Sequence, residues 1–274
     1  MPFINNAHLN LLIKSIKKDR WLLIGLFVGI FLLVFIVGVT FPADDPNQLQ
    51  GFEELLENPI YQVIIGSLVS LSSLKGWFVM GWFSYSWWIG IPFALYLGIQ
   101  IFTNEIAQGT ADHLLTAPVS RREVLVIRYI SAALELLMMP LSSFLGVFLT
   151  FLLLNIDFPL LDTIGVITID YVFFLTAMTL TLLISLIFVE IKRSLILTGV
   201  VFVISYFFQT FGSLNPDLEI LRSFSIFETR PVVEIFVTSA TDKILPNFTI
   251  LIVLSGLLLA FSFFIIERVE IRKR

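Results

Sequence analysis

Long apolar segments recur along the whole chain, and they constrain its fold more than any other feature. About 20 consecutive apolar residues are enough to cross a hydrocarbon core of roughly 30 Å. A segment exposed to lipid must satisfy its own backbone hydrogen bonds, so each such segment is expected to be a helix. We predict an all-α integral membrane protein with six transmembrane helices, over residues 21–41, 77–103, 124–154, 163–188, 194–211 and 247–266.

Composition narrows the function classes. The chain is 57% hydrophobic and only 14% charged, whereas about 25% of the residues of a soluble domain are charged. It has no cysteine and two histidines, His8 and His113, which lie far apart, so no His/Cys metal centre is predicted. The net charge of −4 does not indicate a nucleic-acid partner. No catalytic residue is predicted.

Lysine and arginine side chains are distributed unevenly over the predicted loops. Thirteen of the 17 fall on the side that carries both termini, and only Lys75, Arg222, Arg230 and Lys243 fall on the other side. Cytoplasmic loops carry an excess of Lys and Arg, so we expect both termini to be cytoplasmic. The first apolar run is too long for a signal peptide, and we expect it to be retained as a span.

The remaining segments are predicted to lie at the two membrane surfaces. Residues 1–20 read as an amphipathic helix on the cytoplasmic surface, serving either as a mechanical elbow or as a simple anchor. Its apolar stripe consists of Leu9, Leu12, Ile13 and Ile16. Residues 59–74 are expected to be an outer helix, and residues 212–246 an extracellular or re-entrant segment. Pro140 predicts a kink or a break within the third span.

The segment between the second and third spans carries the most specific pattern. Polar and apolar side chains alternate at helical spacing within residues 104–118. Its polar face is Glu105, Gln108 and Asp112, and its apolar face is Ala107, Ala111, Leu114 and Leu115. This helix should end before Pro118. Ser120 and Glu123 then form a capping box that starts the next helix. The pattern predicts a stiff helical knob at the inner membrane surface.

This segment resembles the ABC-2-type transporter permeases. The family pattern E-x(3)-GT-x(3)-LL-x(2)-P-x-SR is matched by Glu105, Gly109, Thr110, Leu114, Leu115, Pro118, Ser120 and Arg121. The resemblance implies that residues 104–118 are a coupling helix that docks on a separate ATPase subunit. It also implies a second copy of this chain or a paralogous permease as partner, export as the direction, and the plasma membrane of a prokaryote as the location.

The expected role of the coupling segment rests on its side chains. Leu114 and Leu115 would anchor it in the ATPase, Glu105 and Asp112 would pair with basic groups, and Gly109 would allow close backbone approach. Arg121 would contact either lipid headgroups or the ATPase. The chain contains no G-x-x-x-x-G-K-[ST] motif, so ATP and Mg²⁺ are expected on the partner subunit.

Ionisable and aromatic residues within the spans are candidates for a translocation path. A charged side chain at the membrane centre costs about 2.5–3.5 kcal/mol on insertion scales, so Glu135 and Asp170 each need a reason. One interpretation is that Glu135 and Asp170 line a path for substrate, and the other is that they reach water near the membrane interface. Trp87 and Trp88 line a pocket or pack against helices and lipid. Two further tryptophans, Trp77 and Trp82, suit an outer aromatic belt.

Two other functions remain open at this stage. One is a secondary transporter or channel that needs no ATPase, against which no internal inverted repeat is apparent. The other is a non-transporting membrane anchor that uses residues 104–118 to dock a cytoplasmic complex. The sequence does not identify the transported substrate.

Overall fold

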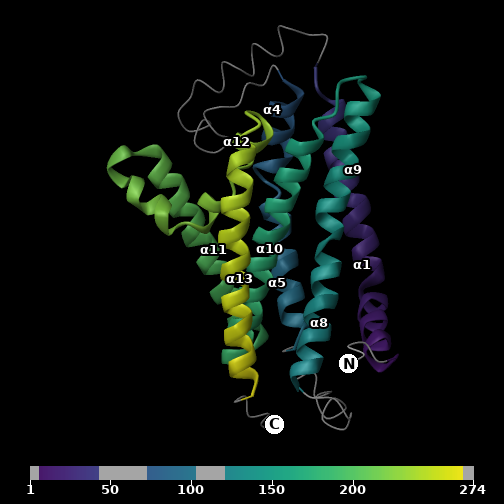
Figure 1. Cartoon of the computed structure of the whole chain (residues 1–274), viewed down its shortest axis with the longest axis vertical. Coiled ribbons are helices and arrows are strands. Elements are labelled where there is room, and N and C mark those ends of the chain that lie inside the picture. Colours follow the sequence, from purple (N-terminus) through teal and green to yellow (C-terminus); the bar gives the residue numbers. More distant parts are fainter. Residues whose placement is uncertain (1–5, 43–72, 103–120, 268–274) are drawn as a thin grey trace.

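The computed structural model describes residues 6–42, 73–102 and 121–267. These residues form helices joined by turns and contain no β-strand, which confirms the predicted all-α class. The long helices run side by side along the longest axis of the molecule (Figure 1). The start of the first helix and the end of the last helix lie at the same end of the molecule (Figure 1). We call this the inner end and the opposite one the outer end, following the predicted orientation.

Among the described residues, five helical segments are long and apolar enough to cross a membrane. They are α1 (Asn6–Val39), α8 (Arg121–Leu136) together with α9 (Met138–Leu153), α10 (Leu160–Phe188), α11 (Ile191–Leu214) and α13 (Ile244–Ile266). Each of them coincides with one of the predicted spans. Residues 6–20 of the predicted surface helix and the first span form one helix, and no break separates them within α1.

The second predicted span is not one continuous helix, and the prediction was wrong in this respect. The chain forms α4 (Leu74–Phe78), the π-helix η1 (Val79–Phe83), a turn over residues 84–86, and α5 (Trp87–Gln100). The hydroxyl of Ser86 lies 3.3 Å from the Phe83 carbonyl oxygen, and serine side chains compete with helical backbone bonds in this way. These pieces follow one another from the outer end toward the inner end (Figure 1).

The third predicted span breaks beside its proline, as the sequence indicated. Proline has no amide hydrogen, so Pro140 leaves the Leu136 carbonyl without its usual helical partner. The helix α8 ends at Leu136, the chain turns at Leu137, and α9 begins at Met138. The predicted break is therefore confirmed.

The chain between α11 and α13 forms only short helices. They are η2 (Pro216–Phe224), η3 (Ile226–Thr229), α12 (Val232–Phe236) and η4 (Thr241–Lys243). None of them is long enough to cross a membrane. Their expected place outside the membrane or re-entering it stays a prediction. Residues 59–72 of the expected outer helix lie outside the described part of the chain.

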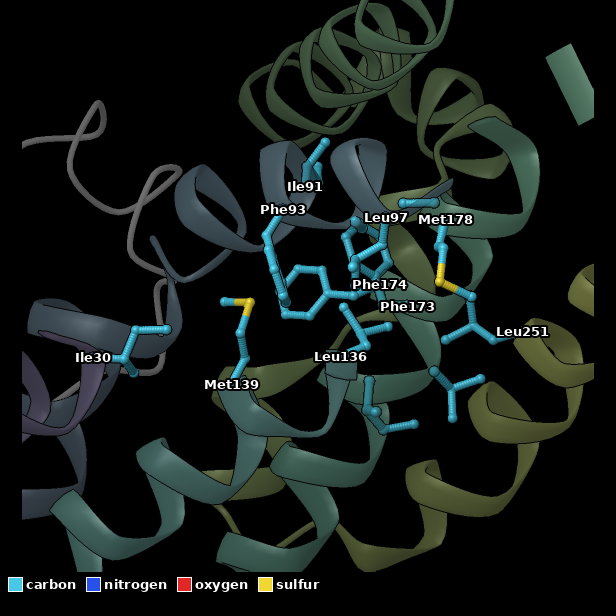
Figure 2. Close-up of a cluster of buried hydrophobic side chains, with 14 of the residues drawn as sticks. Ile30, Ile91, Phe93, Leu97, Leu136, Met139, Phe173, Phe174, Met178 and Leu251 are labelled. Carbon is cyan, nitrogen blue, oxygen red and sulfur yellow. The ribbon is translucent and has the colours of Figure 1, made fainter. Parts of the chain in front are cut away.

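The helix α10 is the centre of the bundle. Its most apolar window is 61% buried, against 22% for the corresponding windows of α1, α11 and α13. Phe173, Phe174 and Met178 of α10 lie in a cluster of buried side chains to which α5, α8, α9 and α13 also contribute (Figure 2). The helices with the less buried windows therefore present most of their apolar surface outward, as lipid contact requires.

Glycine allows α5 to pack closely on α10. A Cβ atom on Gly98 would lie 2.5 Å from the Met178 carbonyl oxygen, which no real side chain tolerates. Small residues at helix contacts let two backbones approach closely in membrane proteins. The position of α5 beside the central helix thus depends on this glycine.

Candidate functional site

The whole predicted coupling segment, residues 104–118, lies outside the described residues. This applies to Glu105, Gly109, Thr110, Asp112, Leu114, Leu115 and Pro118. Arg121 is described as the first residue of α8. Glu123 of the predicted capping box lies in the first turn of α8, whereas Ser120 lies outside the described residues, so the capping box stays a prediction.

The helices that flank this segment are tied to their neighbours at the inner end. The ammonium of Lys18 on α1 donates to the side-chain oxygen of Gln100 on α5 over 3.2 Å. The Tyr96 hydroxyl donates to Asp19 over 3.0 Å, again from α5 to α1. The end of α5 is therefore held against α1.

The start of α8 has its own partner at the inner end. Arg122 pairs with Glu267, just beyond the end of α13, over 2.5 Å, and both side chains are more than half exposed. The end of α5 and the start of α8 therefore each contact a neighbouring helix at the inner end.

Glu135 is buried in the middle of the α8–α9 segment. Only 3% of its surface is exposed, and its carboxylate accepts a hydrogen bond of 3.2 Å from the Ser131 hydroxyl one turn earlier. It lies just before the break beside Pro140. Its proposed place on a translocation path stays a prediction, and its burial between helices is compatible with it.

Asp170 is paired with a residue from the segment between α11 and α13. The Nε and Nη2 atoms of Arg230 lie 2.6 and 3.1 Å from the two carboxylate oxygens of Asp170. Both side chains are buried, with 4% of Arg230 and 9% of Asp170 exposed. This two-pronged contact is the geometry in which a guanidinium binds a carboxylate most strongly. The Asp170 carboxylate therefore serves first as the partner of Arg230.

The same arginine reaches the turn that interrupts the second predicted span. Its Nη2 donates to the Phe83 carbonyl over 2.5 Å and to the Ser86 hydroxyl over 2.6 Å. The Ser86 hydroxyl in turn lies 3.1 Å from Asp170. Arg230 thus satisfies a carbonyl at the end of η1, next to the helix break, a role that arginine also has at ordinary helix ends.

An aromatic cluster surrounds this ion pair. The ring of Phe227, from η3, packs against Trp87 of α5 at 5.2 Å and against Phe173 of α10 at 5.1 Å between ring centroids. It also meets Tyr206 of α11 at 5.5 Å. Phe227 therefore inserts among three helices as an anchor.

The tryptophans of the second predicted span have three different surroundings. Trp87 belongs to the aromatic cluster, and Trp88 is 65% exposed on the surface of the bundle. Trp77 and Trp82 are buried, and their indole nitrogens donate to the Val37 carbonyl and the Ser143 hydroxyl. The predicted outer aromatic belt is wrong for these last two, because their N–H groups find partners inside the bundle.

A second ion pair lies nearer the outer end. The ammonium of Lys75 on α4 is 2.5 Å from Asp162 on α10. The Ser239 hydroxyl donates to the same carboxylate over 2.8 Å. Ser239 has a φ of 56°, a backbone conformation uncommon for residues other than glycine. The segment before α13 is therefore fastened to α10 at two points, Arg230 and Ser239.

The exposed part of this segment carries a third ion pair. Arg222 binds Glu228 through two hydrogen bonds of 3.0 and 2.7 Å. That hydrogen bonding raises the pKa of Arg222 above its usual value. Both side chains reach solvent, so this pair differs from Asp170–Arg230 in burial rather than in geometry.

In the part of the chain that the structure describes, no group of three or more His, Cys, Asp or Glu side chains is placed to hold a metal ion. Arg230, Asp170 and Ser86 instead bind one another or the backbone.

Sequence reasoning missed Arg230, Ser86 and Phe227 as parts of one site. Arg230 was interpreted only as one of four basic residues on the outer side. The available signal was the solitary carboxylate of Asp170 within a span, because a charge at membrane depth pairs with an opposite charge or a carbonyl. An arginine in a neighbouring apolar segment was the partner to consider.

These features define a polytopic helical membrane protein with buried ion pairs and a segment that inserts between its helices. A family model described as ABC-2 family transporter protein matches residues 9–265, nearly the whole chain, and the chain belongs to this family. No curated protein and no solved structure matches the sequence.

Proposed function

We propose that this chain is the membrane-spanning permease subunit of an ATP-driven ABC exporter, with ATP hydrolysis on a separate nucleotide-binding subunit. The observation that carries the proposal is the family match over residues 9–265. It agrees with a chain of apolar helices that has no phosphate-binding motif of its own.

The coupling segment is the proposed contact with the ATPase. Residues 104–118 lie between α5 and α8 in the sequence. The end of α5 and the start of α8 both lie toward the inner end. Closure of the ATPase pair around ATP would push on this segment. Because α5 packs on α10 at Gly98 and α8 leads into α9, a push there is passed to the middle of the bundle.

The proposed assembly contains two permease chains. The second is another copy of this chain or a paralogous permease, together with two ATPase subunits and surrounding lipid. Side chains such as Ile196 on α11 and Leu257 on α13 are more than half exposed. These apolar faces suit lipid or a second permease chain.

The proposed path for substrate follows the polar groups within the bundle. Glu135 and Trp87 are the better candidates, because both are at least partly buried between helices. Asp170 takes part only if its pairing with Arg230 opens. Trp88 faces outward in the single chain, so it reaches a path only at a contact with a second chain.

Co-purification tests the proposal directly. The tagged chain is expressed with a candidate ABC ATPase subunit from the same genome, and the complex is isolated in detergent. We expect a stable complex with the wild-type chain. We expect its loss in Leu114→Glu, because a charge placed in an apolar contact is left without solvent or a partner.

The matched control is Leu257→Glu, which places the same charge on the exposed face of α13, away from residues 104–118. A complex that tolerates Leu114→Glu as well as wild type would contradict the proposed contact. Absence of any ATPase complex would favour the secondary transporter or channel, and a complex without ATP-driven transport would favour the membrane anchor.

A further inference from the structure

The segment between α11 and α13 reaches deep into the helix bundle at one place. Arg230 binds Asp170, which lies about ten residues, or roughly 15 Å, from the outer start of α10. Ser225, Phe227 and Arg230 are all buried. Irregular backbone at such a depth is tolerated only where protein covers it. Residues 225–230 therefore fill space between helices, and we call them the outer plug.

Two kinds of contact hold the outer plug. Phe227 packs among aromatic rings, and such contacts can slide and repack. Arg230 instead makes directed hydrogen bonds to Asp170, Ser86 and the Phe83 carbonyl, which either exist or do not. The backbone at Ile226 is also fixed, because its amide donates to the Ser205 hydroxyl on α11 over 2.8 Å.

The partners of Arg230 come from the two elements that would have to separate from the plug. Ser86 and Phe83 belong to the interrupted span that leads through α5 to the coupling segment, and Asp170 belongs to the central helix. A movement of α5 relative to α10 would alter all of these hydrogen bonds at once. Because these hydrogen bonds are either made or broken, a small movement of α5 would switch the segment between two distinct arrangements.

We propose that Arg230, bound to Asp170, Ser86 and the Phe83 carbonyl, is a latch that keeps the outer plug inserted and the outer end of the protein closed, and that transport requires its release. The claim that transport requires release of the latch rests on the proposed function. The claim that Arg230 keeps the outer plug inserted concerns the single chain and is testable without an ATPase.

Thiol labelling measures whether the plug is inserted. The chain has no cysteine, so Val232→Cys introduces a single thiol. Val232 is 5% exposed and follows the outer plug directly. A charged, membrane-impermeant maleimide reacts with this thiol only when the segment opens. We expect Arg230→Ala to raise the labelling rate by at least roughly tenfold, because local opening sets the rate.

The chain offers a matched control and a conservative variant. Arg222→Ala removes the exposed ion pair of the same segment and should change labelling by no more than about threefold. Arg230→Lys keeps the charge but loses the planar fork, so its labelling should lie between wild type and Arg230→Ala. It also keeps the test valid if Arg230→Ala does not fold.

A double variant separates a latch from a merely structural contact. Asp170→Asn with Arg230→Gln removes both charges, so neither is left buried and unpaired. We expect this double variant to label more slowly than either single variant. Labelling of folded Arg230→Ala at the wild-type rate, or of the double variant at the summed rate of the singles, would overturn the latch.

The second part of the proposal is tested in the complex with the ATPase. Addition of ATP and vanadate to the Val232→Cys complex should speed labelling, and it should add little when Arg230→Ala is also present. A complex that hydrolyses ATP but labels at the same rate with and without nucleotide would overturn the gating role while leaving the proposed function intact. Failure to form any complex would reject the proposed function, and the single-chain labelling would still decide the latch.

Discussion

Two ion pairs of nearly equal length lie in different parts of this protein. Arg230 and Asp170, toward the outer end, are separated by 2.6 Å, and Arg122 and Glu267, at the inner end, by 2.5 Å. The outer pair is less than 10% exposed, whereas both members of the inner pair are more than half exposed. Surroundings, and not distance, therefore decide what each pair contributes. The outer pair fixes one arrangement, and the inner pair constrains its helix ends only weakly.

The largest effect is expected from breaking the buried pair on one side only. Arg230→Ala leaves the Asp170 carboxylate buried without its cation, together with the Phe83 carbonyl. Removal of one partner of a buried pair costs about 3–5 kcal/mol. Thermal unfolding of the purified chain in detergent should show this loss, and an unchanged unfolding temperature would show that water already reaches the site.

The aromatic anchor should rank next. Phe227→Ala removes a ring that packs against Trp87, Phe173 and Tyr206. Truncation of a buried phenylalanine costs on the order of 3 kcal/mol. The same unfolding assay measures it. Phe224→Ala is the control, because Phe224 is 71% exposed, and equal losses for the two would contradict the anchor.

The partly buried pair should give an intermediate result. Lys75 and Asp162 are 27% and 10% exposed, between the two extremes. We expect Lys75→Ala to cost about 1–2 kcal/mol in the unfolding assay, above an exposed pair and below a buried one. A loss of unfolding free energy as large as that of Arg230→Ala would contradict the proposal that burial sets the contribution of each pair.

The exposed pair should contribute least. Arg122→Ala removes the contact with Glu267, and exposed pairs contribute about 0–1 kcal/mol. Raised salt should reduce even this small difference in unfolding free energy. A loss above about 2 kcal/mol would mean that the inner helix ends are held as firmly as the outer ones.

The sequence predicted the features that depend on local composition. Apolar length identified five helical segments among the described residues, and Pro140 identified the break between α8 and α9. Each of these follows from neighbouring residues alone. The same holds for the family, whose motif lies within residues 104–121.

The features that were missed depend on residues far apart in the chain. The turn at residues 84–86 contains no proline and no charged residue, and the Phe83 carbonyl just before it is bound by Arg230, 147 residues away. Trp77 and Trp82 were assigned to a membrane surface, but their partners Val37 and Ser143 are on other helices. Periodicity cannot supply such pairings, because it reports only one element at a time.

The central claim is that this chain couples ATP hydrolysis on another subunit to movement of its own helices. The most direct measurement is the ATP hydrolysis rate of the co-purified complex in lipid vesicles, compared between wild type, Glu105→Ala and Arg122→Ala. We expect the ATP hydrolysis rate to be roughly tenfold lower in Glu105→Ala, because this change removes a charged contact of the proposed interface with the ATPase. Arg122→Ala should stay within about threefold of wild type. Equal rates in wild type and Glu105→Ala would contradict the account.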